Sequence, residues 1–156
     1  MRIDNLSHLD NCRVQIHADG SPAGSAVVQN GSVELIQPAD NVIVGLEYIS
    51  VVSPMPLELD AQDGSSMLRK KSLSDLRIRF YNTIGGEVQV GSGDFQAICS
   101  RDVLEDDLDE PVAVKTAVVP VVTLSGYEDA PTITIRQSGS LPMNIASLTV
   151  KFNVVE

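Results

Sequence analysis

The sequence predicts an all-β protein, a β-sandwich or partly open barrel of about ten short, mostly antiparallel strands with little or no helix. Apolar and polar residues alternate with a period of two in many short runs, which is typical of half-buried strands. Turn-forming Gly, Pro, Asn and Asp residues separate these runs. The apolar residues are mainly Val, Ile and Leu, with three Phe, three Tyr and no Trp, and β-branched residues favour strands.

The N-terminal part predicts a series of hairpins. Residues 18–22 contain Asp-Gly and Pro and predict a turn. Asn30-Gly31 is typical of a tight two-residue hairpin turn. The strands expected around these turns are residues 12–17, 25–29, 32–36 and 41–46.

The rest of the chain continues the pattern. Pro54 and Pro56 follow the run 47–52, which therefore predicts an edge strand or an extended linker. Pro120 is expected to break the run 112–124. The other expected strands are residues 75–81, 87–90, 95–99, 132–137 and 145–155. With 156 residues, the chain is expected to form a small β-hairpin module over residues 1–40 and a main β-sandwich domain over residues 41–156.

The run 75–81 has the clearest alternation in the chain. Leu76, Ile78 and Phe80 are expected to face the core. Arg77, Arg79 and Tyr81 are expected to face solvent or a partner.

Charge and hydropathy exclude several classes of function. The chain has 21 acidic and 11 basic residues and a formal net charge of −10, which disfavours sequence-specific nucleic-acid binding. The acidic surface serves either solubility or a conduit through which DNA slides without sticking. No apolar stretch reaches membrane-spanning length, and the N-terminus lacks a signal peptide's apolar core, so we expect a chain made in the cytoplasm without membrane contact.

Residues that commonly carry catalysis or bind metals are sparse. His8 and His17 are the only histidines, and His17 is expected to be a solvated surface residue at a strand end. Cys12 and Cys99 are expected to be buried free thiols. The acidic run 105–110 is interpreted as a solvated face, either a helical turn or a loop, rather than a calcium site. We therefore predict a protein that is not an enzyme and has no cofactor, metal or catalytic residues; a cryptic enzyme would depend on His8 or His17.

Positive charge is concentrated in one place, at the start of the clearest strand. This cluster either binds phosphates or meets the acidic surface of a neighbouring copy, and the second is favoured in an otherwise acidic chain. The candidate inter-subunit interface comprises Arg69, Lys70, Lys71, Arg77 and Arg79. The rival interpretation is a carbohydrate-binding sandwich, for which the candidate aromatic residues are Tyr48, Tyr81 and Tyr127.

Several segments, taken in order, resemble one protein family. Residues 69–86 resemble its basic cluster, strand and Gly-Gly turn, and residues 42–50 resemble its Val-Gly-Leu-x-Tyr block. The other similar segments are residues 9–20, 56–59, 132–137 and 141–145. The family is the tail nozzle, or tail tubular, proteins of short-tailed bacteriophages, in their C-terminal region. Members are usually several times longer and carry a large β-propeller region ahead of this part.

The resemblance implies a structural virion protein of a phage tail, assembled in the host cytoplasm. It implies a nozzle or ring component, or an attachment component, that forms a homo-oligomer, with six-fold symmetry expected for the ring, and contacts other tail proteins. DNA would pass through the channel of such a ring. The alternative is a receptor- or carbohydrate-binding β-sandwich module on the virion surface.

Overall fold

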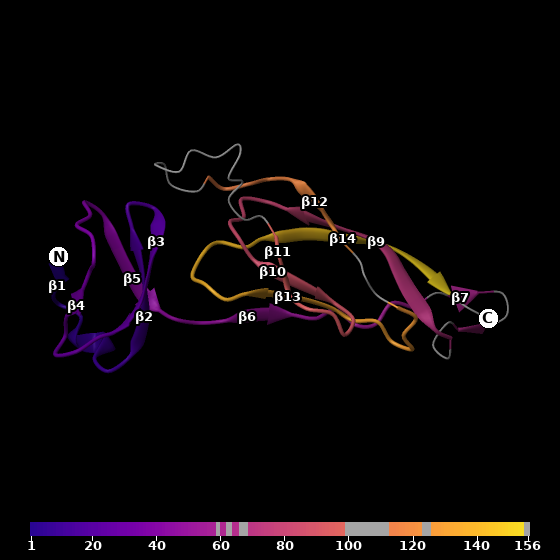
Figure 1. Ribbon diagram of the computed structural model, residues 1–156, viewed down its shortest axis with the longest axis horizontal. Coiled ribbons are helices and arrows are strands. Elements are labelled where there is room, and N and C mark those ends of the chain that lie inside the picture. The colour runs from indigo at the N-terminus through magenta and orange to yellow at the C-terminus, as the bar shows by residue number, and fades with distance from the viewer. Residues whose placement is uncertain (59, 62–63, 66–68, 99–112, 123–125, 155–156) are drawn as a thin grey trace. The chain divides into compact units, whose positions relative to one another are not determined.

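The computed structural model describes residues 1–58, 60–61, 64–65, 69–98, 113–122 and 126–154 (Figure 1). Within these residues the chain is almost entirely β, and the 3-10 turn η1 (Ser7–Leu9) is the one helical element. The expected all-β class is therefore confirmed. The strands belong to two compact units. Of the described residues, the first unit comprises 1–49, 113 and 138–140, and the second comprises the others.

The first unit contains a three-stranded antiparallel sheet and a two-stranded ribbon. The sheet has the order β3-β2-β5, and the ribbon pairs β1 with β4. Their bounds are β1 (Arg2–Ile3), β2 (Arg13–Ala18), β3 (Ser21–Val27), β4 (Val33–Glu34) and β5 (Val42–Leu46). The core contains Leu6, Val14, Ile16, Val28, Val33 and Leu35. Because β5 pairs with β2, this unit extends to Ile49 rather than ending at the expected boundary, residue 40.

The turn at Asn30-Gly31 has the geometry expected from its sequence. Gln29 and Ser32 exchange backbone hydrogen bonds of 3.0 and 3.1 Å across it. Asn30 and Gly31 have φ angles of 51° and 66°, which a two-residue turn of this kind requires. The flanking strands pair differently from a simple hairpin, because β3 pairs with β2 while β4 pairs with β1.

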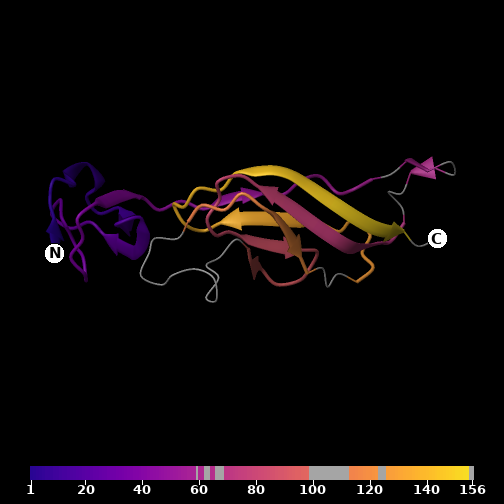
Figure 2. The ribbon, with the colours of Figure 1, turned by 90° about the horizontal axis from the view of Figure 1, so that it is seen from above.

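The second unit contains two antiparallel sheets that form a β-sandwich. One has the order β11-β10-β13-β6 and the other the order β12-β9-β14, and a small β7–β8 hairpin is separate from both. Strands β9 and β14 run side by side in Figures 1 and 2. The bounds are β6 (Ser50–Val52), β7 (Asp60–Ala61), β8 (Gly64–Ser65), β9 (Lys71–Phe80), β10 (Glu87–Val90), β11 (Gln96–Ala97), β12 (Val118–Val121), β13 (Ile133–Gln137) and β14 (Ile145–Val154).

The core of the second unit lies between these two sheets. Strand β9 contributes Leu76, Ile78 and Phe80, each with no exposed surface. Val88 on β10 and Ile135 on β13 pack into the same cluster from the other sheet. The predicted orientation of β9 is therefore confirmed: its even-numbered residues face the core from Leu76 to Phe80.

A β-bulge reverses this alternation nearer the start of β9. Lys151 of β14 lies opposite Asp75, but the next residue, Phe152, lies opposite Leu73, so Ser74 is the extra residue. A bulge changes which residues face the core. The odd-numbered Lys71 and Leu73 are therefore buried, whereas the odd-numbered Arg77 is exposed.

Two prolines lie within strands, although the sequence placed them at a turn and a break. Pro22 lies in β3 and Pro120 lies in β12. Both strands are at sheet edges, where a missing N–H is tolerated. Pro54 and Pro56 follow β6, which is an edge strand as expected.

Candidate interaction face on strand β9

The structure separates the predicted basic cluster into two groups. Lys70 is exposed and Arg69 is half-buried, whereas Lys71 is only 1% exposed. Its backbone exchanges hydrogen bonds of 2.7 and 2.9 Å with Glu128. The side chain of Lys71 therefore lies inside the second unit and is removed from the candidate contact surface. The cause is the bulge at Ser74, which the alternation of residues 75–81 does not signal.

Arg77 and Arg79 are exposed on the outer face of the β12-β9-β14 sheet. Pro120 and Thr149 lie opposite Arg77 on the two neighbouring strands, and Val118 and Ser147 lie opposite Arg79. The candidate face, defined here as Arg77, Arg79 and the exposed side chains beside them on β12 and β14, thus combines positive charge with small and apolar residues.

The two arginines differ in their ionic partners. The Arg77 Nε lies 3.3 Å from an Asp75 carboxylate oxygen, with the two side chains 59% and 43% exposed. A pair this exposed is worth about 0–1 kcal/mol. The Arg79 guanidinium makes no ion pair or hydrogen bond with the residues described here, so its charge is available to a partner.

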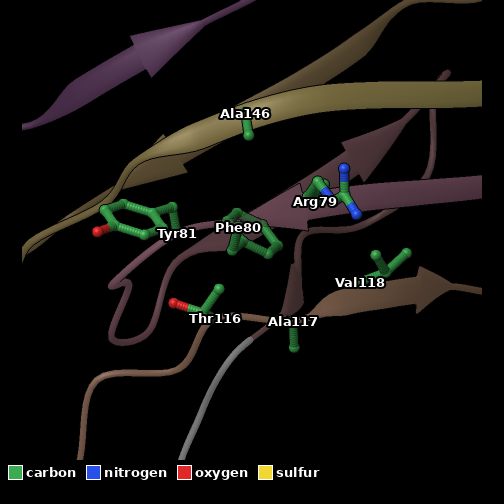
Figure 3. Close-up of a pocket in the computed structure, with 7 residues that line it drawn as sticks. All are labelled: Arg79, Phe80, Tyr81, Thr116, Ala117, Val118 and Ala146. Atoms are coloured by element: carbon green, nitrogen blue, oxygen red, sulfur yellow. The ribbon is translucent and has the colours of Figure 1, made fainter.

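A shallow hollow of about 490 Å³ surrounds Arg79 (Figure 3). A second bulge forms one side of it: Ile145 and Ser147 of β14 lie opposite Phe80 and Arg79, which makes Ala146 the extra residue. The hollow is lined by Arg79, Phe80, Tyr81, Thr116, Ala117, Val118 and Ala146. Tyr81 is 60% exposed, so an aromatic ring and the Arg79 cation lie on one open surface. That combination suits an anionic group with an apolar portion.

The histidine environments differ from the sequence-based expectation in one case. His8 lies exposed in η1, but His17 is half-buried and its Nε2 lies 2.5 Å from the Ser140 Oγ. Gln15 also contacts Ser140, because its Oε1 accepts a hydrogen bond from the Ser140 N–H. His17 and Gln15 are neighbours on the outer face of β2. The alternation of apolar and polar residues in this strand does not predict their contact with Ser140, which is distant in sequence.

Several other polar contacts in the second unit were also missed by sequence analysis. Arg136 Nε lies 2.5 Å from a Glu87 carboxylate oxygen, and its guanidinium carbon lies 3.7 Å from the centre of the Phe95 ring. Thr83 is fully buried, and its hydroxyl accepts a hydrogen bond from the Asn144 N–H at 2.9 Å. Pairing of β10 with β13 brings Glu87 and Arg136 together, and pairing between distant strands cannot be inferred from single runs.

The remaining chemical predictions have mixed outcomes. Cys12 is a free thiol but is half-buried rather than fully buried, whereas Cys99 and the acidic run 105–110 lie outside the described residues. Among the described residues, no three His, Cys, Asp or Glu side chains are placed to share a metal ion. The described part also contains no helix long and apolar enough to cross a membrane.

A comparison with protein-family models and a search of curated proteins found no match to this chain.

Proposed function

We propose that this chain is a structural component of a bacteriophage tail that works by assembly rather than catalysis. It packs as a homo-oligomer, in a nozzle or ring around the DNA channel, and contacts other tail proteins. The observation that carries the proposal is the resemblance of several segments, in the same order, to the C-terminal region of tail nozzle proteins.

The face on β9 supports the assembly part of the proposal. Arg77 and Arg79 place exposed positive charge on one face of a chain with a net charge of −10, and Arg79 has no ionic partner among the described residues. Charge of opposite sign on a neighbouring molecule would be attracted to this face and would fix its orientation. Other copies of the chain, which are acidic overall, supply such charge.

A double substitution tests this contact. Arg77→Gln with Arg79→Gln should leave folding unchanged, because both side chains are exposed, and should weaken self-association at least about tenfold. Association is measured by analytical ultracentrifugation over a concentration series, and incorporation by co-purification with tail particles. Arg2→Gln with Arg13→Gln is the matched control, since it removes the same charge from exposed sites in the first unit.

Two results would contradict the proposal. One is a wild-type chain that stays monomeric at high concentration and fails to join tail particles. The other is equal association of the Arg77/Arg79 variant and its control, which would mean that this face makes no contact in the assembly.

A receptor- or carbohydrate-binding module is the second candidate. The hollow favours it, because Tyr81 offers an exposed aromatic ring beside the Arg79 cation (Figure 3). A glycan array with the Tyr81→Ala variant as the control separates the two. Specific binding that is lost in the variant supports the recognition module, and an array without signal supports assembly.

A further inference from the structure

Strand β5 is an edge strand with an unusually open edge. Among the residues that the structure describes, its one partner strand is β2, and its sequence, Val-Ile-Val-Gly-Leu, has no charge and no proline. Ile43 and Leu46 are 65% and 54% exposed. Edge strands of this kind readily pair with another strand, so proteins usually protect them.

The backbone groups on this edge can be assigned from two hydrogen bonds. The Glu47 N–H donates to the Arg13 carbonyl at 3.3 Å, and the Asp19 N–H donates to the Asn41 carbonyl at 2.8 Å. In an antiparallel ladder these bonds make the Val14/Leu46 and Ala18/Val42 pairs non-hydrogen-bonded. Backbone groups alternate in direction, so the N–H and C=O of Val42, Val44 and Leu46 point away from β2 toward the open edge.

The other long edges in the described part carry protective features. Strand β3 contains Pro22 and a register shift, and β14 has a bulge at Ala146. Just before β12, the Ala117 carbonyl accepts a hydrogen bond from the Phe80 N–H of β9. Because backbone groups alternate in direction, the nitrogen of Pro120 in β12 points toward the open edge. That edge therefore lacks a donor where a partner strand would need one. Strand β5 has no such feature.

We propose that the open edge of β5 pairs with β5 of a second copy of this chain, antiparallel and centred on Val44. In this register Val44 lies opposite Val44, and Val42 lies opposite Leu46, so all the outward N–H and C=O groups of these residues find partners.

The side chains and charges of β5 complement themselves in this register. Ile43 lies opposite Gly45 of the second copy, and Gly45 leaves room because a Cβ built on it would meet nothing within 4 Å. The same spacing sets Asn41 opposite Glu47 and Asp40 opposite Tyr48. No two like charges are therefore opposed, and an amide can donate to a carboxylate.

The contact is isologous, so it joins copies in pairs and cannot by itself close a ring. It is independent of the proposed tail function, because backbone pairing and apolar packing produce it rather than the β9 cations. A contact of one short strand belongs to the small, transient class of interfaces. A concentration-dependent dimer is the expected state.

Sedimentation of the full chain tests the proposal at protein concentrations up to about 1 mM, the weak end of measurable association. Val44→Pro removes the central outward N–H without removing a hydrogen bond to β2, and it should abolish the dimer. Ile43→Lys, which places a charge on the exposed face of the edge, should weaken dimerisation at least about tenfold. Ile36→Lys is the matched control, because Ile36 is 98% exposed and lies outside β5, and it should dimerise like wild type.

Far-UV circular dichroism tests whether each variant is folded. If Val44→Pro does not fold, the Ile43→Lys variant decides the outcome. A wild-type chain that remains monomeric, or dimers that persist unchanged in Ile43→Lys, would overturn the proposal.

The register has its own test in a background with Cys12 and Cys99 replaced by Ser. Ile43→Cys and Gly45→Cys chains are mixed under mild oxidation. Opposed residues of a non-hydrogen-bonded pair have Cα atoms about 4.5 Å apart, within disulfide range. A covalent dimer that forms faster in the mixture than in either chain alone supports pairing centred on Val44. Equal rates would reject this register.

Discussion

Replacing Phe80 by Ala should remove a large part of the stability of the second unit. Phe80 has no exposed surface and lies in the cluster that both sheets of the sandwich build. Burying an aromatic side chain of this size contributes about 1.5–3 kcal/mol by transfer alone. The cavity left by truncation raises the total loss to about 3–5 kcal/mol. Typical domains have only about 5–15 kcal/mol of unfolding free energy, so the loss is easily measured.

The assay is urea unfolding followed by far-UV circular dichroism, with hydrogen exchange to separate β9 and β14 from the first unit. With a slope of about 1–3 kcal/mol per molar urea, the midpoint should fall by at least about 1 M. Tyr81→Ala is the control, because Tyr81 is an adjacent aromatic residue but is 60% exposed, and it should cost well under half as much. A loss below about 1 kcal/mol for Phe80→Ala, or equal losses for both, would refute the assigned orientation of β9.

Two further substitutions test local features, again by urea unfolding. Thr83→Val should cost about 0.5–1.5 kcal/mol, because it keeps the shape of a fully buried side chain but removes the acceptor of the Asn144 N–H; a change within experimental error would mean that this bond is not formed. Gly31→Ala should cost about 1–2 kcal/mol, because Gly31 has φ +66° and a Cβ there would lie 3.2 Å from the Ser7 nitrogen. Asn30→Gly is its control, and equal stability of the two variants would contradict the turn assignment.

Local patterns predicted the class of fold and the orientation of its clearest strand. The alternation at Leu76, Ile78 and Phe80 is sufficient to predict the orientation of β9, because successive side chains of a strand point to opposite faces. The Asn30-Gly31 turn was equally readable, since its backbone angles depend on these two residues. Neither pattern, however, identifies the strand on the other side of a hydrogen-bond ladder. That explains why β3 and β4 were expected to pair along their length but instead belong to different sheets.

The candidate face shows the same limit more sharply. Arg77 and Arg79 were placed on the outer surface by alternation within their own strand. Lys71 was grouped with them by sequence proximity, yet the extra residue Ser74 turns it into the interior. A bulge depends on how two strands align, so only the structure of the pair reveals it. Likewise, the hollow around Arg79 depends on the bulge at Ala146, far away in sequence.

The two proposed surfaces differ in physical character, and this makes them separable in one sample. Contacts of the Arg77/Arg79 face are ionic and exposed, so they should weaken as the screening length falls from about 10 Å at 0.1 M salt to about 3 Å at 1 M. Pairing at β5 relies on backbone hydrogen bonds and apolar contact, which such screening leaves largely unchanged. If both contacts form, high salt should reduce larger assemblies to dimers, and Ile43→Lys should then reduce those dimers to monomers. The order of these steps follows from the kind of interaction at each surface, so the opposite order would mean that the two roles have been assigned to the wrong surfaces.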